Sequence, residues 1–363
     1  MRMVISAGDP SGDVRAAELV HELGRLTSLS VSGLGGRHLR GAGAETVFDL
    51  DRYSVMGFAE VFTSLGSLLR LRRDMRSHIL RTDPDLLLLV DYPGFNIPLA
   101  EWASRSGIRV IYYVSPQLWA WGSGRVKRIR GAVDLMITLF EFEVDFYRRH
   151  GIMAKWAGHP LADSIPSPLE QSLTGRIALL PGSRRQEVSM LLPRMAGAFS
   201  ILSDRGATGS AVIAVSPGVP EELYQPALSM EGVTAAHSVK DALEGASAAV
   251  VCSGTATLET AMWGVPFIIT YRTSPLTYLL ARMLVRGVKN IGMANLVAGE
   301  AFSVELLQGR VTPVNIAEAL EPLLIPGTAR ERAVSGALKV REALGPEGSS
   351  RRAALMIIEE TGV

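Results

Sequence analysis

Short apolar runs alternate with longer amphipathic segments along most of the chain. Continuous apolar runs without period-two alternation predict strands that are covered on both faces, as in a parallel sheet. Segments such as DVRAAELVHELGRL and IPLAEWASRSG instead have the spacing of helices. Strands alternating with helices predict βαβ units and an α/β fold. The predicted strands are MVISA, LSVSGL, LLLLV, RVIYYV, LMITL and MAKWA in the first half, and RIALL, SAVIAV, GVTAA, SAAVVC and VPFIITY in the second.

The alternation pauses at HPLADSIPSPLEQSLTG, where three prolines, several serines and a final glycine indicate a linker. We therefore expect two Rossmann-like, doubly wound domains, residues 1–165 and 166–363, with the last helix free to pack back on the first domain. Ligands of such sheets bind outside the carboxyl ends of the strands. The expected site is a cleft that the two domains face.

Composition narrows the class of protein. A length of 363 residues fits two domains, and a net charge of +1 provides no general attraction for nucleic acid. The single cysteine, Cys252, excludes a disulfide framework and a cysteine-rich metal site, and it fits a reducing cytoplasm. Because no secretory signal or 20-residue apolar run is visible, we expect a protein that is soluble or lies on a membrane surface.

Asp91 ends the apolar run LLLLV, and a Tyr-Pro-Gly turn follows it. Loop residues at the carboxyl ends of strands frequently carry chemistry, so a catalytic carboxylate is one interpretation. The other is a helix cap or turn residue, because aspartate favours both roles. Position alone leaves the two open.

Two loops of the second half have the pattern of phosphate sites. In LLPGSRRQEV a strand ends, Pro181 and Gly182 turn the chain, and Ser183 is in position to cap a helix that starts near Arg184. Free N–H groups at a helix start and a nearby guanidinium bind phosphate well. The alternative is a capped helix with solvated arginines.

The second of these loops, VVCSGTATLE, repeats the strand, turn and helix through Ser253, Gly254 and Thr255. Glu259 falls one turn inside the helix, where a carboxylate could accept hydrogen bonds from a ribose diol, as in dinucleotide folds. Its alternative role is a favourable charge in an early helix turn.

The first-half loop AGDPSGD lacks the G-x-G-x-x-G fingerprint, so a dinucleotide-dependent oxidoreductase is not expected. Asp9 and Asp13 flank Ser11 and Gly12, which suits sugar hydroxyls or an amide better than phosphate; Asp13 could instead cap the first helix. Trp119 and Trp121 could wall a sugar or acyl pocket or pack inside the domain, and His159 could bind a ligand or be structural.

The stretch from Ser54 to Arg76 places an apolar stripe beside a basic cluster, the pattern of a helix at a membrane interface. The same stripe could instead pack on the first sheet with its arginines solvated. The apolar positions are Phe58, Val61, Phe62, Leu65, Leu68, Leu69 and Leu71, and the basic ones are Arg70, Arg72, Arg73 and Arg76.

Taken in order, nine short motifs resemble those of the lipid-A-disaccharide synthases, which are inverting glycosyltransferases of the GT-B fold. The resemblance covers nearly the full length through AGDPSGD, SVMGFAEV, VDYPGFN, YYVSPQLWAW, FEFEVDFY, GHPLAD, LPGSRRQE, SGTATLE and NLVAG. It implies joining UDP-2,3-diacylglucosamine to 2,3-diacylglucosamine 1-phosphate (lipid X) in a β(1→6) linkage, with release of UDP. It also implies work at the inner face of the cytoplasmic membrane, which favours membrane contact by residues 54–76, with part of the stripe, Met56 to Phe62, exposed and part buried.

The resemblance places Asp91 at the family's catalytic aspartate, Arg184 at its phosphate-site arginine and Asn295 at its second-domain asparagine. Many members have glutamate at Asp9, a second carboxylate at Gly94 and proline at Ala294. We expect substrate binding by Asp9, Ser11, Gly12, Asp13, Asn96, Trp119 and His159. We expect UDP binding by Gly182, Ser183, Arg184, Ser253, Gly254, Thr255, Glu259 and Asn295.

No metal or other cofactor is expected, since the UDP-sugar is a substrate and no D-x-D motif or histidine cluster is present. The expected partners are the two lipid-linked sugars and the inner-membrane surface, with no nucleic acid and with a homodimer left open. One alternative function is another GT-B enzyme of UDP-sugars, an epimerase or a different glycosyltransferase. A second is a non-catalytic two-lobed protein that binds a nucleotide sugar without turnover.

Overall fold

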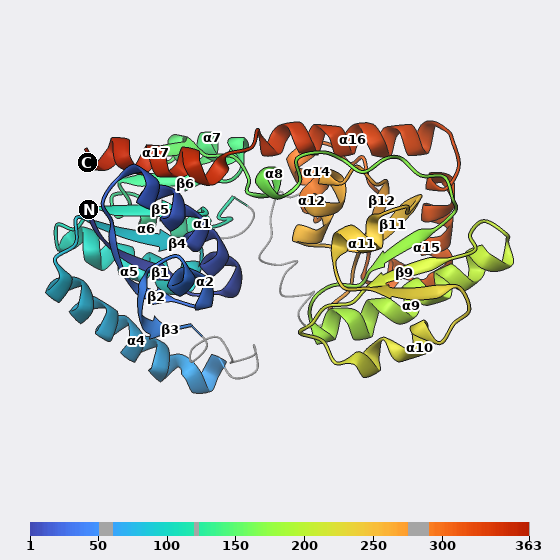
Figure 1. Ribbon diagram of the computed structural model, residues 1–363, viewed down its shortest axis with the longest axis horizontal. Helices are drawn as coiled ribbons and strands as arrows, with labels where there is room; N and C mark the ends of the chain where they lie inside the picture. The colour runs from blue at the N-terminus through green and yellow to red at the C-terminus, as the bar shows by residue number, and fades with distance from the viewer. Residues whose placement is uncertain (51–60, 120–122, 275–289, 363) are drawn as a thin grey trace. The chain divides into compact units, whose positions relative to one another are not determined.

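The computed structural model describes residues 1–50, 61–119, 123–274 and 290–362, without the side chains of residues 61–65 and 123. Within it the chain forms two compact units (Figure 1). Unit 1 contains Met1–Asp163 and Pro346–Val363, and unit 2 contains Ser164–Gly345. The sequence had placed the boundary near residue 165.

Unit 1 is built on a seven-stranded sheet in the order β3-β2-β1-β4-β5-β6-β7, and every pair of neighbours is parallel. All five residues of β4 are buried, as the continuous apolar run predicted. The strands are β1 (Arg2–Ala7), β2 (Ser30–Gly35), β3 (Glu45–Asp49), β4 (Leu86–Val90), β5 (Val110–Tyr113), β6 (Leu135–Thr138) and β7 (Ala154–Trp156).

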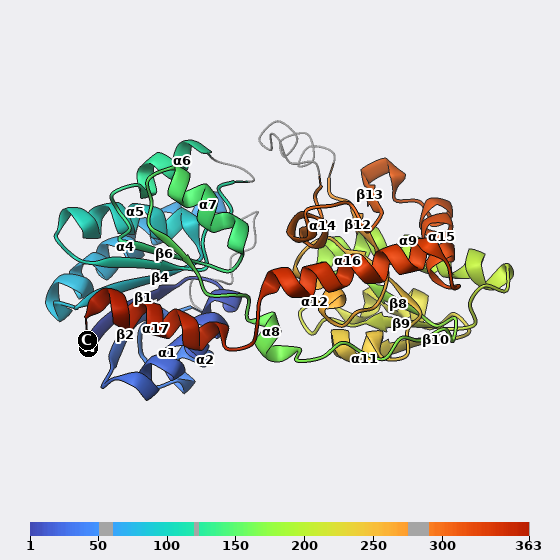
Figure 2. The same ribbon diagram turned by 90° about the horizontal axis from the view of Figure 1, so that it is seen from above.

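Helices cover both faces of this sheet. One face packs against α4 (Val61–Thr82), α5 (Pro93–Arg105), α6 (Ser123–Ile129) and α7 (Glu141–Arg149) in a single apolar core. The other carries α1 (Pro10–Leu26), against which the last helix, α17 (Ser349–Thr361), packs (Figure 2). The remaining short helices are α2 (Arg37–Gly41) and α8 (Leu161–Ser164).

The carboxylate of Asp163 fixes the start of α17 in unit 1. It accepts hydrogen bonds from the backbone N–H of Gly348 and from the hydroxyl of Ser349, the latter at 2.7 Å. Arg352 adds a 2.8 Å bond to the carbonyl of Ala157. The last helix therefore belongs to the first unit although it follows the second in sequence.

Unit 2 has a six-stranded parallel sheet in the order β10-β9-β8-β11-β12-β13. Its strands are β8 (Ile177–Leu180), β9 (Ala211–Ala214), β10 (Val233–Ala236), β11 (Ala248–Cys252), β12 (Phe267–Tyr271) and β13 (Glu305–Leu307). Its helices are α9 (Arg185–Asp204), α10 (Gln225–Leu228), α11 (Val239–Leu243), α12 (Thr255–Met262), α14 (Met293–Ala298), α15 (Pro313–Leu320) and α16 (Thr328–Leu344), with 3-10 turns η2 (Glu221–Leu223), η3 (Gln308–Arg310) and η4 (Glu321–Leu323).

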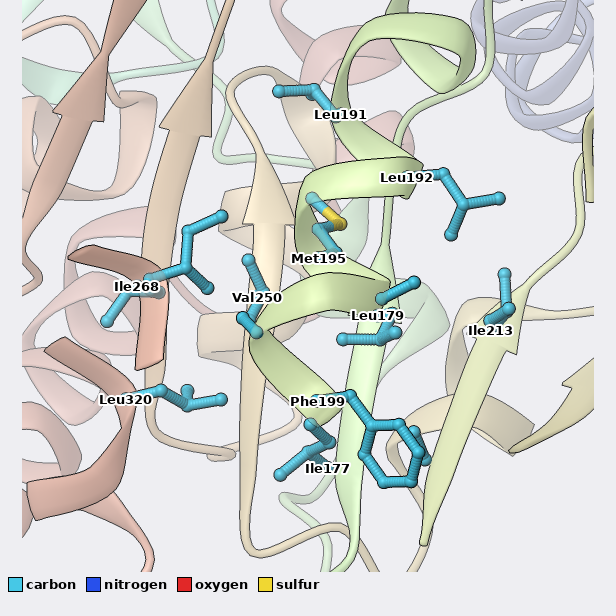
Figure 3. Packing of buried hydrophobic residues seen from close by; sticks show 14 of the residues in the cluster. Ile177, Leu179, Leu191, Leu192, Met195, Phe199, Ile213, Val250, Ile268 and Leu320 are labelled. Carbon is cyan, nitrogen blue, oxygen red and sulfur yellow. The ribbon is translucent and has the colours of Figure 1, made fainter. Parts of the chain in front are cut away.

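The core of unit 2 lies between α9 and the central strands (Figure 3). Met195 and Phe199 of α9 belong to one buried cluster with Leu179 of β8 and Val250 of β11. Each is at most 3% exposed. This packing fixes where α9 begins relative to the ends of β8 and β11.

Both sheets reverse their strand order once. The reversal lies between β1 and β4 in unit 1 and between β8 and β11 in unit 2. At such a switch point the loops that follow the two adjacent strands diverge, which leaves room for a ligand outside the carboxyl ends. The loops at Asp9 and Asp91 follow the first pair of strands, and those at Arg184 and Ser253 follow the second.

The apolar stripe of α4 is divided between core and surface over its described part. Leu71, Met75 and Ile79 are at most 2% exposed and pack in the apolar core of unit 1, which agrees with the expectation that part of the stripe is buried. Leu69 is 54% exposed. The predicted membrane contact at Met56 to Phe62 lies outside the described residues or side chains. Across residues 1–50, 61–119, 123–274 and 290–362, no helix combines the length and the apolar character of a membrane span.

Candidate active site

The backbone around Asp91 is strained where β4 ends. Asp91 and Tyr92 have φ angles of 45° and 49°, a left-handed conformation that non-glycine residues rarely adopt. Two hydrogen bonds hold the Asp91 carbonyl, from the Tyr112 hydroxyl at 2.5 Å and the Asn96 amide at 2.8 Å, while Asp91 N–H donates to Tyr113 at 3.1 Å. Strain of this kind persists only where the surroundings impose it, and it concentrates at functional sites.

Asp91 does not cap the following helix. The N-cap of α5 is Tyr92, which makes no side-chain capping bond, and Pro93 begins the helix. The capping alternative for Asp91 is therefore wrong. The carboxyl group of Asp91 is therefore not used to cap α5.

Asn96 is a fully buried framework residue. Its side-chain oxygen accepts a 2.7 Å bond from the Ser6 hydroxyl, and its amide nitrogen donates to the carbonyls of Ser6, Val90 and Asp91. These bonds occupy the side chain and tie the ends of β1 and β4 together. Asn96 thus positions Asp91, and the substrate contact expected for Asn96 from sequence stays a prediction.

Burial and the nearby charge of Asp9 raise the pKa of Asp91 from its ordinary value of 3.8 to about 6. The backbone N–H of Tyr92 partly offsets this rise. Asp9 is the N-cap of α1, and its carboxylate accepts a 2.8 Å bond from the N–H of Gly12. The neighbouring Ser11 is exposed at the start of α1. Asp9 and Asp91 therefore form a carboxylate pair at the switch point of unit 1.

Asp13 organises the glycine-rich segment at residues 33–43. It is 2% exposed, and its carboxylate accepts bonds from the backbone N–H groups of Gly36 (2.6 Å), His38 (2.9 Å) and Leu39 (3.3 Å). It does not cap α1, since Asp9 does. With three internal donors bound, Asp13 has a structural role, and its expected substrate contact stays a prediction.

A buried carboxylate, Glu143, fixes the loop that carries Trp119. One carboxylate oxygen accepts the Trp119 indole N–H at 2.9 Å, and the other accepts the Ser115 hydroxyl at 2.9 Å. Burial raises the pKa of Glu143 to about 7, although these donors oppose the rise. Trp119 also packs edge-on against Phe142 at 5.1 Å between ring centroids. Trp119 is half-buried, so one part of its ring remains accessible.

His159 is a structural residue. It is 6% exposed and its ring lies 5.4 Å from that of Phe140. Burial lowers its pKa to about 3, so the ring is neutral and Nδ1 accepts the N–H of Leu161 at 3.1 Å. These contacts favour the structural alternative for His159, and its ligand role stays a prediction.

In unit 2, the start of α9 carries an internal carboxylate. The side chain of Glu187 accepts the backbone N–H groups of Ser183 (3.1 Å) and Arg184 (3.2 Å), and it pairs with the Arg184 guanidinium at 3.2 Å. The helix begins at Arg185 with Arg184 as its N-cap, so the expected cap by Ser183 is wrong. The Arg184 side chain is 77% exposed and can reach a phosphate.

The second loop of unit 2 meets the first through Gly182 and Cys252. A Cβ atom on Gly182 would lie 3.2 Å from the Cys252 sulfur and 2.5 Å from a Glu187 oxygen, so no larger residue fits there. Gly254, with a φ of 147°, is the N-cap of α12, and Thr255 begins the helix with its side chain exposed. The N-termini of α9 and α12 thus lie at one edge of the sheet.

Glu259 lies inside α12 with its side chain half-buried, and burial raises its pKa. Its neighbour along the loop, Ser253, is also half-buried and donates a 3.4 Å bond to the carbonyl of Ile291. The sequence placed both residues in the UDP site. The structure brings them to the same end of β11 as the predicted phosphate loop.

Comparison with known proteins shows the family to which this chain belongs. A family model described as lipid-A-disaccharide synthetase matches residues 3–358. The lipid-A-disaccharide synthase of Geobacter metallireducens is 38% identical over 375 residues, covering 99% of this chain and 97% of that protein. That of Myxococcus xanthus is 37% identical with the same coverage. The chain belongs to this family.

Solved structures similar to this lipid-A-disaccharide synthetase family member share its GT-B fold. A calicheamicin glycosyltransferase superposes with a TM-score of 0.63 at 16% identity, covering 99% of this chain and 98% of its own. A UDP-GlcNAc 2-epimerase from Neisseria meningitidis gives 0.58 at 12% identity and covers 99% of each chain. The expected fold, two Rossmann-like domains, is confirmed.

In this family member Asn295 has a framework role, and its expected contact with UDP stays a prediction. It is fully buried, and its side chain donates to the Ser303 carbonyl (2.8 Å) and to Glu305 (2.9 Å) while accepting from Ser303 N–H (3.0 Å). Glu305 also accepts the N–H of Gly292 at 3.0 Å, which fixes the start of α14. Asn295 thereby supports the loops beside the predicted UDP site.

Sequence reasoning did not single out Glu143, Tyr92 or Tyr271 as site residues. Glu143 stood in the motif FEFEVDFY, but nothing in its spacing distinguished a buried acid from the exposed Glu141. Tyr271 ends β12, and its pKa is raised by burial and by the nearby Cys252 and Glu187. Its position at a strand end was the available signal. Within residues 1–50, 61–119, 123–274 and 290–362, no three His, Cys, Asp or Glu side chains gather as a metal site would.

Proposed function

We propose that this glycosyltransferase joins UDP-2,3-diacylglucosamine to 2,3-diacylglucosamine 1-phosphate (lipid X) with inversion at the anomeric carbon. Family membership supports lipid A disaccharide synthesis. The single observation that carries the mechanism is the carboxyl group of Asp91, which has a pKa of about 6 and lies on a strained loop at the switch point of unit 1. We assign the acceptor and the base to unit 1, and the UDP portion of the donor to unit 2.

In the proposed reaction Asp91 accepts the proton of the acceptor 6-hydroxyl while the oxygen attacks C1 of the donor sugar. The new C1–O6 bond forms as the bond from C1 to the UDP oxygen breaks, and the electron pair leaves with UDP. A raised pKa makes Asp91 a stronger base than an ordinary aspartate while leaving it ionised at pH 7. The adjacent charge of Asp9 contributes to this tuning and would lie beside the sugar hydroxyls.

The departing UDP gains negative charge, which unit 2 is suited to stabilise. We assign its phosphates to the exposed Arg184 and to the N-terminal ends of α9 and α12, whose N–H groups and dipoles favour anions. We assign the ribose hydroxyls to Glu259. The Glu187 carboxylate accepts hydrogen bonds from the N–H groups before α9. On phosphate binding it would either release these N–H groups to the phosphate or keep Arg184 in position. No metal is part of the proposal.

We also propose that the protein works as a peripheral enzyme at the inner face of the cytoplasmic membrane. Both proposed substrates carry acyl chains, which must be drawn from a bilayer. On α4, Leu69, Arg70 and Arg73 are exposed and form a small apolar and cationic surface. Each cation near an anionic leaflet contributes about 1 kcal/mol, so binding to anionic vesicles should weaken at high salt. Salt-independent binding would contradict this part.

The test of the proposed function is incubation of the purified protein with UDP-2,3-diacylglucosamine and lipid X in detergent micelles. Mass spectrometry should find UDP and a disaccharide 1-phosphate in equal amounts, and NMR should find a β linkage. Conversion of the UDP-sugar without acceptor would instead indicate an epimerase. UDP binding without any turnover would indicate a binding protein.

A further inference from the structure

Two arginines of α4 lie against the helix that follows Asp91. The Arg72 guanidinium carbon lies 5.4 Å from the ring centroid of Phe95, and that of Arg76 lies 5.3 Å from the ring centroid of Trp102. Phe95 and Trp102 are two turns apart on α5, so they present their rings on the same face. The rings fix both guanidiniums in place, since stacking on an aromatic face orients a guanidinium. Both arginines belong to the basic cluster seen in the sequence.

Neither charge has an acidic partner among the described residues. Two neighbouring cations do have acidic partners: Arg73 pairs with Asp74 at 3.2 Å, and Arg128 pairs with Glu101 through two bonds of 2.7 Å. Among the described residues, the hydrogen bond that Arg72 makes goes to a carbonyl, that of Gly94 at 3.3 Å. The Nε atoms of Arg72 and Arg76 are buried and lack an acceptor within the described part of the chain.

The electrostatics of this pair favour an anion. Burial and the charges of Arg76 and Arg128 lower the pKa of Arg72. The two guanidinium groups repel each other, and each has lost water on the side that packs against α5. A doubly negative ligand on the solvent side would offset both the repulsion and the lost hydration. Guanidinium forks match the oxygen geometry of phosphate. Both side chains are only partly buried, so their Nη groups can reach a ligand.

Arg72 and Arg76 also pack against the segment that carries Asp91, the proposed base. Arg72 bonds to Gly94, three residues after Asp91, and Phe95 stacks on Tyr92 at 5.8 Å between centroids. The charges of Arg72 and Asp9 both act on the Tyr92 hydroxyl. An anion held by Arg72 would therefore lie beside the acceptor sugar whose hydroxyl meets Asp91.

We propose that Arg72, assisted by Arg76, binds the phosphate monoester of the acceptor sugar and so sets the enzyme's requirement for a 1-phosphorylated acceptor. This inference rests on the proposed function. The same chemistry would suit a phosphate of the bilayer surface, and the experiment below separates the two sources. Arg72 is a specificity-determining residue in this account, while Asp91 remains the base.

The experiment compares two acceptors in neutral detergent micelles, lipid X and its dephosphorylated form, 2,3-diacylglucosamine. Arg72→Met keeps the aliphatic stem over Phe95, and Arg72→Lys keeps the charge but loses the fork. Arg72→Met should lower kcat/KM for lipid X roughly 10–100-fold, the usual loss for a charge-assisted contact. It should leave kcat/KM for the dephosphorylated acceptor within about twofold, so the preference for phosphate collapses. Arg72→Lys should fall between, and Arg76→Met should repeat the loss in weaker form.

Arg81→Met is the matched control, since Arg81 is an exposed arginine on the same helix. Both acceptors should react with this variant as with the wild type. An unchanged phosphate preference in Arg72→Met would overturn the inference, and weaker binding to anionic vesicles in that case would assign the pair to the bilayer surface. Equal losses with both acceptors would reduce Arg72 to a support of the Asp91 loop. Absence of wild-type turnover with either acceptor would instead refute the proposed function.

Discussion

A Cβ atom at residue 8 would lie 2.0 Å from Cδ1 of Tyr92, so Gly8 and the Tyr92 ring occupy a space that admits no larger pair. Gly8 precedes Asp9 after β1, and Tyr92 follows Asp91 after β4. The contact therefore sets the relative position of the two loops, and the charge of Asp9 on one of them raises the pKa of Asp91 on the other. It also helps hold Tyr92 at a φ of 49°.

Gly8→Ala should push the Tyr92 ring away and displace Asp91 with it. A displacement of about 1 Å at a reacting group can lower turnover by roughly 100-fold, so kcat should fall by that order while UDP affinity stays unchanged. Gly24→Ala, where a Cβ meets nothing within 4 Å, is the control and should keep full activity. Steady-state kinetics and UDP calorimetry check both variants. Normal kcat in Gly8→Ala would show that the contact is not needed.

At pH 8, where a carboxyl group with a pKa of about 7 is mostly ionised, Glu143→Gln should loosen the loop that carries Trp119, because a neutral amide binds the indole and hydroxyl donors more weakly. The KM for the acceptor should rise roughly tenfold if Trp119 walls the acceptor site, with the dissociation constant for UDP unchanged. Glu141→Gln, an exposed acid on the same helix, should behave as the wild type. A change in UDP affinity instead of acceptor KM would place this loop elsewhere in the mechanism.

Arg184→Ala should weaken UDP binding roughly 10–100-fold, because a charge-assisted contact to phosphate is lost. The side chain is exposed and its only ion pair is with Glu187 within the described residues, so stability should change little. Calorimetry with UDP measures the effect. Arg205→Ala, which removes an exposed ion pair with Glu321 at the other end of α9, is the control. Equal UDP affinity in both variants would leave the loop as a plain helix start.

Asp91→Asn should stabilise the fold while it disables the enzyme. Because the folded-state pKa is raised, folded Asp91 binds a proton more tightly than unfolded Asp91, so wild-type stability falls as pH rises from about 4 to about 6. The variant lacks this loss and tolerates the left-handed backbone, which asparagine adopts readily. At pH 8 it should be more stable by about 1–2 kcal/mol after allowance for partial solvent exposure. Denaturation of both proteins at pH 4 and pH 8 measures the difference in unfolding free energy between the variant and the wild type. The same difference at both pH values would contradict the raised pKa.

Periodicity was sufficient to predict the fold because both sheets are parallel and covered on both faces. The run LLLLV is the fully buried β4, and the linker near residue 165 falls beside the boundary at Asp163 and Ser164. The return of α17 to unit 1 depends on Asp163 and Arg352, whose bonds to partners distant in sequence no local pattern reveals.

The predicted site residues fall into two groups, those whose polar atoms are held by hydrogen bonds inside the protein and those whose polar atoms remain available to a ligand. Asp91 and Arg184 keep groups available, whereas Asp13, Asn96 and Asn295 use theirs to hold backbone. A motif places a polar residue near a site but does not say whether it faces ligand or framework. Only the tertiary hydrogen bonds make that distinction.

The central claim is that Asp91 is the base, and the most direct measurement is the pH dependence of kcat/KM for wild type and Asp91→Asn. Wild-type kcat/KM should fall tenfold per pH unit below about 6, because the protonated carboxyl cannot accept the 6-hydroxyl proton. Asp91→Asn should lose roughly two to four orders of magnitude at pH 8 and show no such decline, with UDP affinity unchanged. Near-normal turnover in the variant, or an acid limb that persists at the same pH, would remove Asp91 from the role of base.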